Sequence, residues 1–325
     1  MNTIKHIQDS FENYLQGLDY SRTPDALYAP IRYVLSLGGK RIRPTLLIAA
    51  YDMFAGGDME NVYRAAAGME IFHNFTLLHD DLMDNADVRR GKPTVHKRWD
   101  TNTAILSGDG MLVLAYRFLS GVKGCDVDKL FDLANETFTG IMEGQQYDME
   151  FETRDDVTEA EYIEMIRLKT SILLAACAQM GAMLGGASAE DAALMYEFGE
   201  KVGLAFQLRD DLLDVYGDQA VFGKKIGGDI LCNKKTYLYI NAYNLSNQTQ
   251  RAELDRWALY DGDDPDSKIA GVRAIYDAVG VKQLSEKLIA KYFEEGLAKL
   301  DKVSLSESRK SVMSDYAKSL MNRNI

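Results

Sequence analysis

The chain has 325 residues, 49 of them acidic and 37 basic, so its formal charge at pH 7 is −12. A surface of this sign repels phosphate backbones, and we therefore expect no nucleic-acid partner. The cysteines at positions 125, 177 and 232 are odd in number, widely spaced and without a CxxC pair. They indicate reduced thiols of a cytoplasmic protein rather than a disulfide or zinc framework.

No linker, low-complexity tract or fixed-period repeat divides the chain. Only five prolines occur, and none lies between Pro93 and Pro265, in a stretch rich in Ala, Leu, Met, Glu and Lys. This composition favours helix, and sustained period-two alternation that would indicate strands is not seen. We predict an all-α fold and a single domain over residues 1–325.

Apolar residues recur at helical spacing from the N-terminus onward. The segment 4–18 predicts an ordinary amphipathic helix rather than a signal peptide. Residues 170–189 carry no formal charge, but their glycine and polar residues favour a core helix over a membrane span. Further helices are predicted over 26–37, 44–54, 62–82, 103–119, 129–143, 159–184, 191–215, 236–243, 250–259, 267–279 and 281–299.

Two acidic motifs of the form DDxxD, at 80–84 and 210–214, each follow an apolar helical run. The first and last Asp of each motif are four residues apart, so their carboxylates share one helix face. Mg²⁺ prefers such oxygens and usually keeps waters and substrate phosphates in its shell. If the two helix ends face one another, they can hold metal ions around one diphosphate.

A single DDxxD in so acidic a chain is more often a solvated helix face. Two copies in Leu, Met and Phe surroundings favour a cation site, because clustered carboxylates repel each other unless a cation neutralises them. An EF-hand is disfavoured, since neither motif has the Asp/Asn alternation, central Gly and twelfth-position Glu of that loop.

Basic residues flank both acidic motifs. GGKRIRP (38–44) places three cations after a glycine pair and before a helix, where backbone N–H groups and guanidiniums can form an anion cradle. Each basic pair alone is more often a solvated surface, but as a set the basic residues flank the two acidic motifs with unusual regularity. The other members are Arg89, Arg90, Lys92, Lys169, Lys224, Lys225, Lys234 and Lys235.

An ordered series of motifs resembles the trans-isoprenyl diphosphate synthase (polyprenyl synthetase) family, of the short-chain farnesyl and geranylgeranyl type. The series covers most of the chain and is far more specific than one DDxxD. Its segments are GGKRIRP (38–44), HNFTLLHDDLMDNADVRRGKPTVHKRW (73–99), GQQYDM (144–149), LKTSILLAA (168–176), FQLRDDLLDVYGD (206–218) and GKKIGGDILCNKKTY (223–237).

The resemblance implies an all-α bundle with a deep central cavity, a cytoplasmic homodimer, and Mg²⁺ as cofactor with Mn²⁺ as a possible substitute. It implies isopentenyl diphosphate and dimethylallyl, geranyl or farnesyl diphosphate as substrates. Ionisation of the allylic diphosphate would precede its condensation with isopentenyl diphosphate, with the segment 217–235 ordering over the phosphates.

Site roles follow from the same resemblance, position by position. Asp80, Asp84 and Asp210 would bind Mg²⁺, assisted by Asp81 and Asp214. The isopentenyl diphosphate site would contain Lys40, Arg43, His73 and Arg90. The allylic diphosphate would be held by Arg89, Lys169, Lys224 and Lys234, and Thr170 and Gln207 would present oxygens to the carbocation. His79 and His96 would have structural roles, and the departures at Trp99 and Tyr237 touch no proposed catalytic group.

Phe75 and Thr76 precede the first Asp of the motif by five and four residues, positions that help set the cavity floor in this family. A bulky Phe75 argues against octaprenyl or longer products. The small Thr76, together with a motif that lacks the two-residue insertion of bacterial farnesyl enzymes, favours a C20 product over C15.

Three alternatives remain at this point. A class I terpene cyclase also uses an Asp-rich motif but normally carries an Asn/Ser/Glu-type second metal motif, where this chain repeats DDxxD. A subunit of a heteromeric synthase tends to lose acidic or basic site residues, and none is missing here. A purely structural helical bundle leaves the paired motifs unexplained.

Overall fold

The computed structural model describes residues 3–54, 57–217 and 226–321. The chain folds into two compact units, each assembled from segments distant in the sequence. The first unit comprises Met1–Ala134, Cys177–Met195 and Ser304–Met313, and the second comprises Asn135–Ala176, Tyr196–Val303 and Ser314–Ile325. The single domain expected from the sequence stays a prediction.

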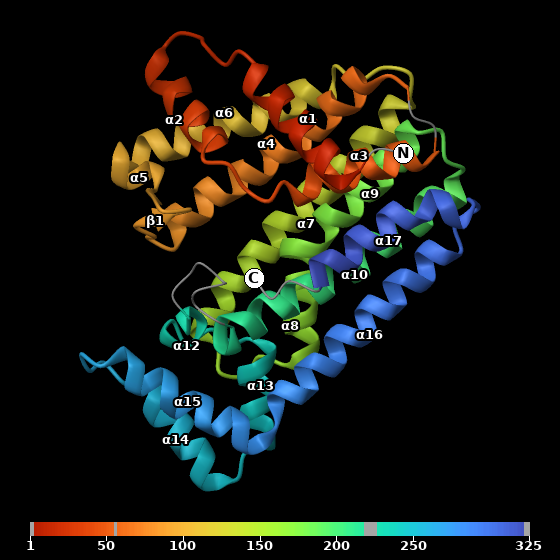
Figure 1. Cartoon of the computed structure of the whole chain (residues 1–325). Coiled ribbons are helices and arrows are strands. Elements are labelled where there is room, and N and C mark those ends of the chain that lie inside the picture. Colours follow the sequence, from red (N-terminus) through yellow and green to blue (C-terminus); the bar gives the residue numbers. More distant parts are fainter. Residues whose placement is uncertain (1–2, 55–56, 218–225, 322–325) are drawn as a thin grey trace. The chain divides into compact units, whose positions relative to one another are not determined.

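The first unit is built around α4 (Met59–Met83), which packs against α3 (Ile42–Phe54) and α6 (Thr101–Leu119). Helix α2 (Asp25–Ser36) lies against α6, and α1 (Ile4–Gly17) lies against α3 (Figure 1). The short α5 (Val95–Arg98) joins the unit's hairpin to α6. Asp58 and Asp100 accept hydrogen bonds from Asn61 and Thr103 N–H and so fix where α4 and α6 begin.

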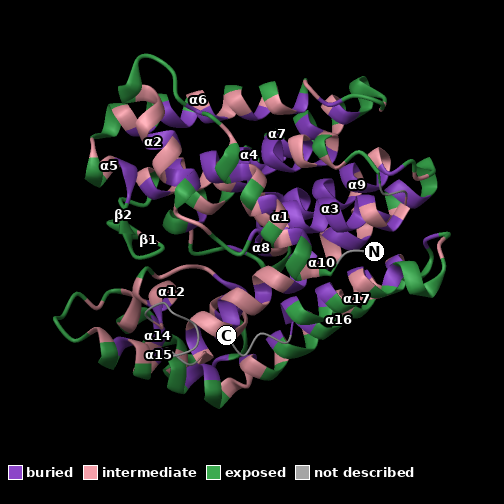
Figure 2. Cartoon of the chain, turned by 45° about the horizontal axis from the view of Figure 1, so that its top comes forward, coloured by how far each residue is buried: buried purple, intermediate pink, exposed green. Residues whose placement is uncertain are grey.

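The core of the first unit lies along α3 and the middle of α4, which are buried over most of their length (Figure 2). Residues 46–50 of α3 are at most 1% exposed. A helix that is apolar on every face must be surrounded by protein, so α3 is held rigidly from all sides. The loop just before α3 is therefore attached to a rigid helix.

A small hairpin in the first unit was not expected from the sequence. Strands β1 (Val88–Arg89) and β2 (Lys92–Pro93) pair antiparallel around Arg90 and Gly91, whose φ angles are +53° and +73°. Two successive left-handed residues form the tight turn that matches the twist of paired strands. The prediction that strands have little support was therefore wrong here, because two-residue strands carry no readable period.

The second unit contains the later part of α7 (Val127–Thr153), α8 (Glu159–Ile166), a π-helical turn η1 (Arg167–Ser171), the start of α9 (Ile172–Leu184) and most of α10 (Ala189–Tyr216). A short α12 (Gly228–Leu231) precedes α13 (Tyr237–Leu245), α14 (Gln248–Ala258), α15 (Pro265–Val279) and α16 (Val281–Asp301). Helix α13 packs against α15 and α16, and α14 packs against α15 (Figure 1). The chain closes with α17 (Glu307–Met321).

The all-α fold class is confirmed, and each predicted range is helical, but the helix predicted over 159–184 is divided into α8, η1 and α9. The prediction for 129–143 was too short, since α7 continues to Thr153, and α17 was not predicted. Residues 172–178, part of the uncharged stretch, are buried as a core helix should be. Across the part of the chain that the structure describes, no helix has the length and apolar character needed to cross a membrane.

Candidate active site

The loop before α3 gathers basic side chains in the first unit. Gly38, Gly39 and Arg41 have φ angles of +72°, +146° and +48°, so the backbone turns sharply before α3 begins at Ile42. The Arg90 guanidinium donates to the Gly38 carbonyl, and a Cβ on Gly39 would lie 2.8 Å from that guanidinium. Glycine suits position 39 because residues with a side chain rarely adopt a φ of +146°, and it also leaves room for the Arg90 guanidinium.

His73, on α4, completes this group. Arg43 Nη1 donates to His73 Nε2 at 3.0 Å. Burial and the neighbouring Arg43 guanidinium lower the pKa of His73 well below its usual range, so the ring is neutral at pH 7. Because a guanidinium can only donate, Nε2 accepts and the ring proton lies on Nδ1. We call Lys40, Arg43, His73 and Arg90 the cradle.

The hairpin is fastened to the end of α4. Arg89 Nε donates to both Asp81 oxygens, at 2.7 and 2.8 Å. Asp81 is only 5% exposed, and burial raises its pKa although the Arg89 charge opposes this. Tyr33 Oη donates to the Pro93 carbonyl at 2.7 Å from the other side. The sequence placed Asp81 beside a metal and Arg89 on a diphosphate, and the observed contact is between these two residues.

The first acidic motif occupies the C-terminal end of α4. Asp84 is the residue that caps this helix, its N–H bonds to the Asp80 carbonyl at 2.8 Å, and the last turn contains no basic residue. A helix C-terminus carries partial negative charge, which makes carboxylates there unfavourable unless a cation is near. The carboxylates of the first acidic motif would therefore be stabilised by a nearby cation.

The second unit holds a cavity of about 240 Å³. Its walls combine carboxylates with lysines and with the polar face of η1. The lining residues are Asp148, Phe151, Glu152, Tyr162, Met165, Ile166, Lys169, Thr170, Gln207, Asp210, Asp211, Asp214, Asp229, Lys234, Lys235 and Thr236. The second DDxxD, at the C-terminal end of α10, thus shares a cavity with Lys169, Thr170, Gln207 and Lys234, as the sequence grouped them.

The turn η1 presents Lys169 and Thr170 to this cavity. A Cβ on Gly144 of α7 would lie 2.4 Å from the Lys169 backbone nitrogen, so α7 can approach η1 only because residue 144 is glycine. Lys169 Nζ forms an ion pair with Asp148 Oδ2 at 2.5 Å. Gly144 and Asp148 lie in the GQQYDM segment, and the sequence predicted a role for neither of them.

A hydrogen-bonded chain orders the wall beside η1. The Thr170 hydroxyl donates to Gln207 Oε1 at 3.0 Å, and Gln207 Nε2 donates to Asp211 Oδ1 at 2.9 Å. Asp211 Oδ2 accepts from the Tyr162 hydroxyl. Burial and the charge of Asp229 raise the pKa of Asp211 to about 8. The chain fixes which way the Gln207 amide points, because its two ends have different partners.

Asp214 fixes the start of α12 by two hydrogen bonds. Its Oδ2 accepts the Asp229 N–H at 2.9 Å, and its carbonyl accepts the Gly227 N–H at 2.7 Å. The Lys234 N–H bonds in turn to the Asp229 carbonyl at 2.9 Å. Asp214 thereby helps to place Lys234 at the cavity wall. Lys224, expected to hold the same diphosphate, lies outside the described residues.

The two candidate chain-length residues lie on α4. Phe75 is 6% exposed, and its ring stands edge-on to the His79 ring with centroids 4.8 Å apart. The centroid of its ring is also 5.5 Å from that of the Phe72 ring. Thr76 is half-buried, and its hydroxyl donates to the His73 carbonyl. His79 has the structural contact expected of it, with Nε2 3.3 Å from the Ile105 carbonyl of α6.

The donors available in each unit fit a divalent cation that prefers oxygen. Both acidic motifs end helices whose last turns lack basic residues, and burial beside Asp210 and Asp229 raises the pKa of Asp211. Within the described ranges, no three His, Cys, Asp or Glu side chains converge as a complete metal cage. Mg²⁺ does not require one, since it keeps waters and substrate phosphates as ligands.

Several residues that build the site gave no signal in the sequence. Tyr162 is an aromatic residue at helical spacing, which usually indicates a core position, yet it bonds to Asp211. Asp229 reaches Asp214 only after the chain turns back at Gly227. Glu70 is 2% exposed and pairs with Arg41 across 29 residues of sequence. Contacts of this kind depend on the fold and have no local pattern.

Comparison with known proteins identifies the family. The polyprenyl synthetase family model matches residues 24–295. The chain belongs to the polyprenyl synthetase family. The all-α isoprenoid-synthase fold and the prenyltransferase class expected from the motifs are thereby confirmed.

Two relatives of similar length are short-chain isoprenyl diphosphate synthases. A geranylgeranyl diphosphate synthase from Methanosarcina mazei is 42% identical over 280 residues, covering 86% of this chain and 84% of that protein. A geranylfarnesyl diphosphate synthase from Natronomonas pharaonis is 35% identical over 319 residues, covering 92% and 91%. The chain is accordingly a short-chain isoprenyl diphosphate synthase by similarity, with the product length left open.

Solved structures of the family agree. A crystal structure of a geranylgeranyl pyrophosphate synthase matches with a TM-score of 0.94 at 41% identity, covering 99% of both chains. A polyprenyl synthase from Caulobacter crescentus, crystallised with calcium and isoprenyl diphosphate, matches with a TM-score of 0.84 at 25% identity, covering 98% and 95%. Divalent cations and prenyl diphosphates therefore occur together in this family.

Proposed function

We propose that this polyprenyl synthetase condenses isopentenyl diphosphate with allylic diphosphates and releases pyrophosphate. The observation that carries the proposal is the contrast between two anion sites. The cradle offers cations from Lys40, Arg43 and Arg90, which suit a diphosphate without metal. The cavity mixes carboxylates with lysines, which suits a diphosphate that carries Mg²⁺.

In the first unit, Asp80 and Asp84 would hold Mg²⁺, and in the second unit Asp210 would do so. Bound there, Mg²⁺ supplies Lewis-acid stabilisation of the charge on the leaving pyrophosphate. Lys169 and Lys234 stabilise the same charge as the allylic C–O bond breaks. The assignments of Arg89 and Lys224 to the allylic diphosphate stay predictions.

The Thr170 hydroxyl and the Gln207 amide oxygen present lone pairs to the allylic cation. Their mutual hydrogen bond keeps both oxygens at the cavity wall. The cation then alkylates the double bond of isopentenyl diphosphate, and the adduct loses a proton that the released pyrophosphate can accept. No side-chain nucleophile is needed, so the site requires charge, orientation and exclusion of water.

We assign a C20 product, geranylgeranyl diphosphate. The geranylgeranyl synthases among the relatives support this length, while the geranylfarnesyl synthase from Natronomonas pharaonis marks C25 as the competing outcome. Phe75 would limit the length of the growing chain, supported by its packing against Phe72 and His79. Such packing resists displacement by a growing chain.

The enzyme would work in the cytoplasm as a homodimer. Free thiols at Cys125, Cys177 and Cys232 support the compartment. The dimer is supported by α6, where Leu106 and Val113, seven residues apart on one face, are 60% and 68% exposed. Light scattering of Leu106→Asp should give a monomer mass; an unchanged dimer mass would remove this face from the proposal.

Incubation of the purified chain with Mg²⁺, isopentenyl diphosphate and dimethylallyl, geranyl or farnesyl diphosphate tests the proposal. The expected result is a linear C20 diphosphate that disappears in EDTA and in Asp210→Asn. A cyclic hydrocarbon from one substrate would instead indicate a terpene cyclase. If the chain is inactive by itself and becomes active when a second prenyl synthase chain is added, it is a subunit of a heteromeric synthase.

A further inference from the structure

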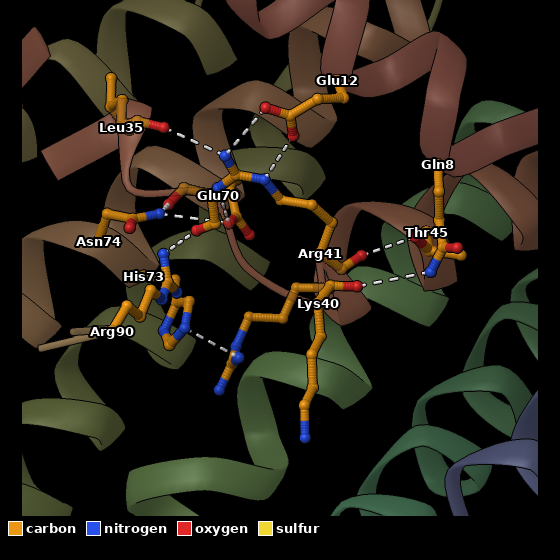
Figure 3. Close-up of polar contacts among 12 residues, drawn as sticks. Gln8, Glu12, Leu35, Lys40, Arg41, Thr45, Glu70, His73, Asn74 and Arg90 are labelled. Atoms are coloured by element: carbon orange, nitrogen blue, oxygen red, sulfur yellow. Dashed lines mark hydrogen bonds and ion pairs between the residues drawn. The ribbon is translucent and has the colours of Figure 1, made fainter. Parts of the chain in front are cut away.

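Arg41 lies in the GGKRIRP loop between two cradle residues, but its side chain does not join them. Its guanidinium is 3% exposed and extends away from the Lys40 side chain (Figure 3). Nη1 donates to Glu70 Oε1 at 2.7 Å, Nε donates to Glu12 Oε2 at 2.9 Å, and Nη2 donates to the Leu35 carbonyl at 3.1 Å. Arg41 therefore ties the loop to three separate helices.

This anchor holds a backbone that is unfavourable by itself. Arg41 has a φ of +48°, a left-handed conformation that a non-glycine residue adopts only when its surroundings enforce it. Its carbonyl accepts both the N–H and the hydroxyl of Thr45, at 3.1 and 2.6 Å, which starts α3. Arg41 thus sets the direction in which Lys40 leaves the loop and Arg43 enters the helix.

Glu70 connects the anchor to the other side of the cradle. It is 2% exposed, lies one helical turn before His73 on α4, and also accepts from Asn74 Nδ2 at 3.2 Å. Burial alone would lower the pKa of Arg41, but the hydrogen bond with Glu12 and the attraction of Glu70 outweigh it and raise that pKa. The Arg41 guanidinium therefore stays charged in the folded protein.

We propose that the buried Arg41–Glu70 pair, with Glu12, is a positioning device that sets the spacing of Lys40, Arg43 and His73 for the diphosphate of isopentenyl diphosphate. The role of that ligand rests on the proposed function. Arg41 and Glu70 touch no substrate; they act through the three cradle residues. A planar guanidinium with several fixed donors suits such a junction better than a lysine does.

The experiment measures kcat and both KM values for Arg41→Gln, Glu70→Gln and the double variant. Removing one member leaves the other charge buried without its partner, which destabilises the fold, whereas removing both relieves much of that penalty. We expect the double variant to regain most of the lost melting temperature. Its KM for isopentenyl diphosphate should nevertheless remain raised about tenfold, equivalent to about 1.4 kcal/mol of binding, with the allylic KM within about twofold of wild type.

Arg309→Gln is the matched control. Arg309 Nη1 donates to the Met53 and Phe54 carbonyls at the far end of α3, about 18 Å along that helix from Arg41. It should lower the melting temperature without separating the two KM values. Lys40→Ala, which removes a cradle cation, should reproduce the selective rise in the KM for isopentenyl diphosphate.

A double variant whose KM for isopentenyl diphosphate returns to wild type along with its stability would overturn the inference, since the pair would then be structural only. Equal changes of both KM values would overturn it as well. Wild-type turnover in the same assay tests the proposed function separately. Should wild type lack turnover, calorimetric titration with pyrophosphate in EDTA decides the inference: the double variant must bind about tenfold more weakly than wild type and Arg309→Gln.

Discussion

The pH dependence of stability in the metal-free protein should depend on Asp211. This carboxyl is 7% exposed, and burial together with the charge of Asp229 raises its pKa from 3.8 to about 8. Between these two values the folded chain holds a proton that the unfolded chain has released. The folded state is therefore favoured most below about pH 4, and this contribution is lost as the pH rises toward 8.

Replacing Asp211 with Asn removes the titration while keeping the shape. One group can contribute at most about 1.4 kcal/mol per pH unit, so wild type in EDTA should lose up to about 2–3 kcal/mol between about pH 5.5 and 7.5. Urea unfolding at both pH values measures this loss directly. In the Asp211→Asn variant, the free energy of unfolding should not show this part of the decrease with pH.

Asp128→Asn, an exposed substitution on α7, is the control and should keep the wild-type slope. If Asp211→Asn keeps that slope too, Asp211 ionises normally in the folded protein. The reasoning that links its burial and the neighbouring charge of Asp229 to a retained proton would then be refuted.

Three further predictions concern other parts of the molecule. Phe75→Ala should lengthen the main product by at least one isoprene unit, as measured by chromatography. It should also cost about 3–5 kcal/mol of stability because a packed ring is lost. An unchanged product length would show that Phe75 does not limit the chain. Burial and the Arg43 charge lower the pKa of His73, so its contribution to stability is present above about pH 6.5 and is lost as the pH falls. His73→Gln should abolish this loss of stability at acid pH, as measured by unfolding curves. Gly144→Ala should lower turnover and melting temperature because its Cβ meets the Lys169 nitrogen at 2.4 Å, whereas Gly17→Ala, with nothing within 4 Å, should leave both near wild type; equal behaviour of the two variants would contradict the packing of α7 on η1.

The sequence predicted the helices well where an apolar stripe recurred over several turns, as along α4 and α10. It failed where no period exists, as in the two-residue strands around Arg90, whose turn depends on two left-handed residues. The end of α7 was also missed, because residues 144–153 are largely polar and exposed although they remain helical. Periodicity reports buried faces, and it weakens where a helix leaves the core.

Within each unit the structure brings several of the candidate residues close together, but the motifs could not tell neighbouring aspartates apart. Asp210 and Asp211 are adjacent and chemically identical in the sequence. A rotation of about 100° along α10 gives Asp211 the buried position beside Tyr162. Arg41 could not be told apart from Lys40 and Arg43 in the same way, because all three lie in one basic motif. Only the structure shows that its side chain is buried against Glu70.

The central claim, that the cradle and the cavity hold two different diphosphates, is tested most directly by crossed kinetics. Lys40→Ala in the cradle should raise the KM for isopentenyl diphosphate about tenfold or more and leave the allylic KM near wild type. Lys169→Ala in the cavity should weaken binding and turnover of the allylic diphosphate and spare the other KM. If both variants raise the same KM, or lower kcat alike with no selectivity, the division of the two substrates between these sites is wrong.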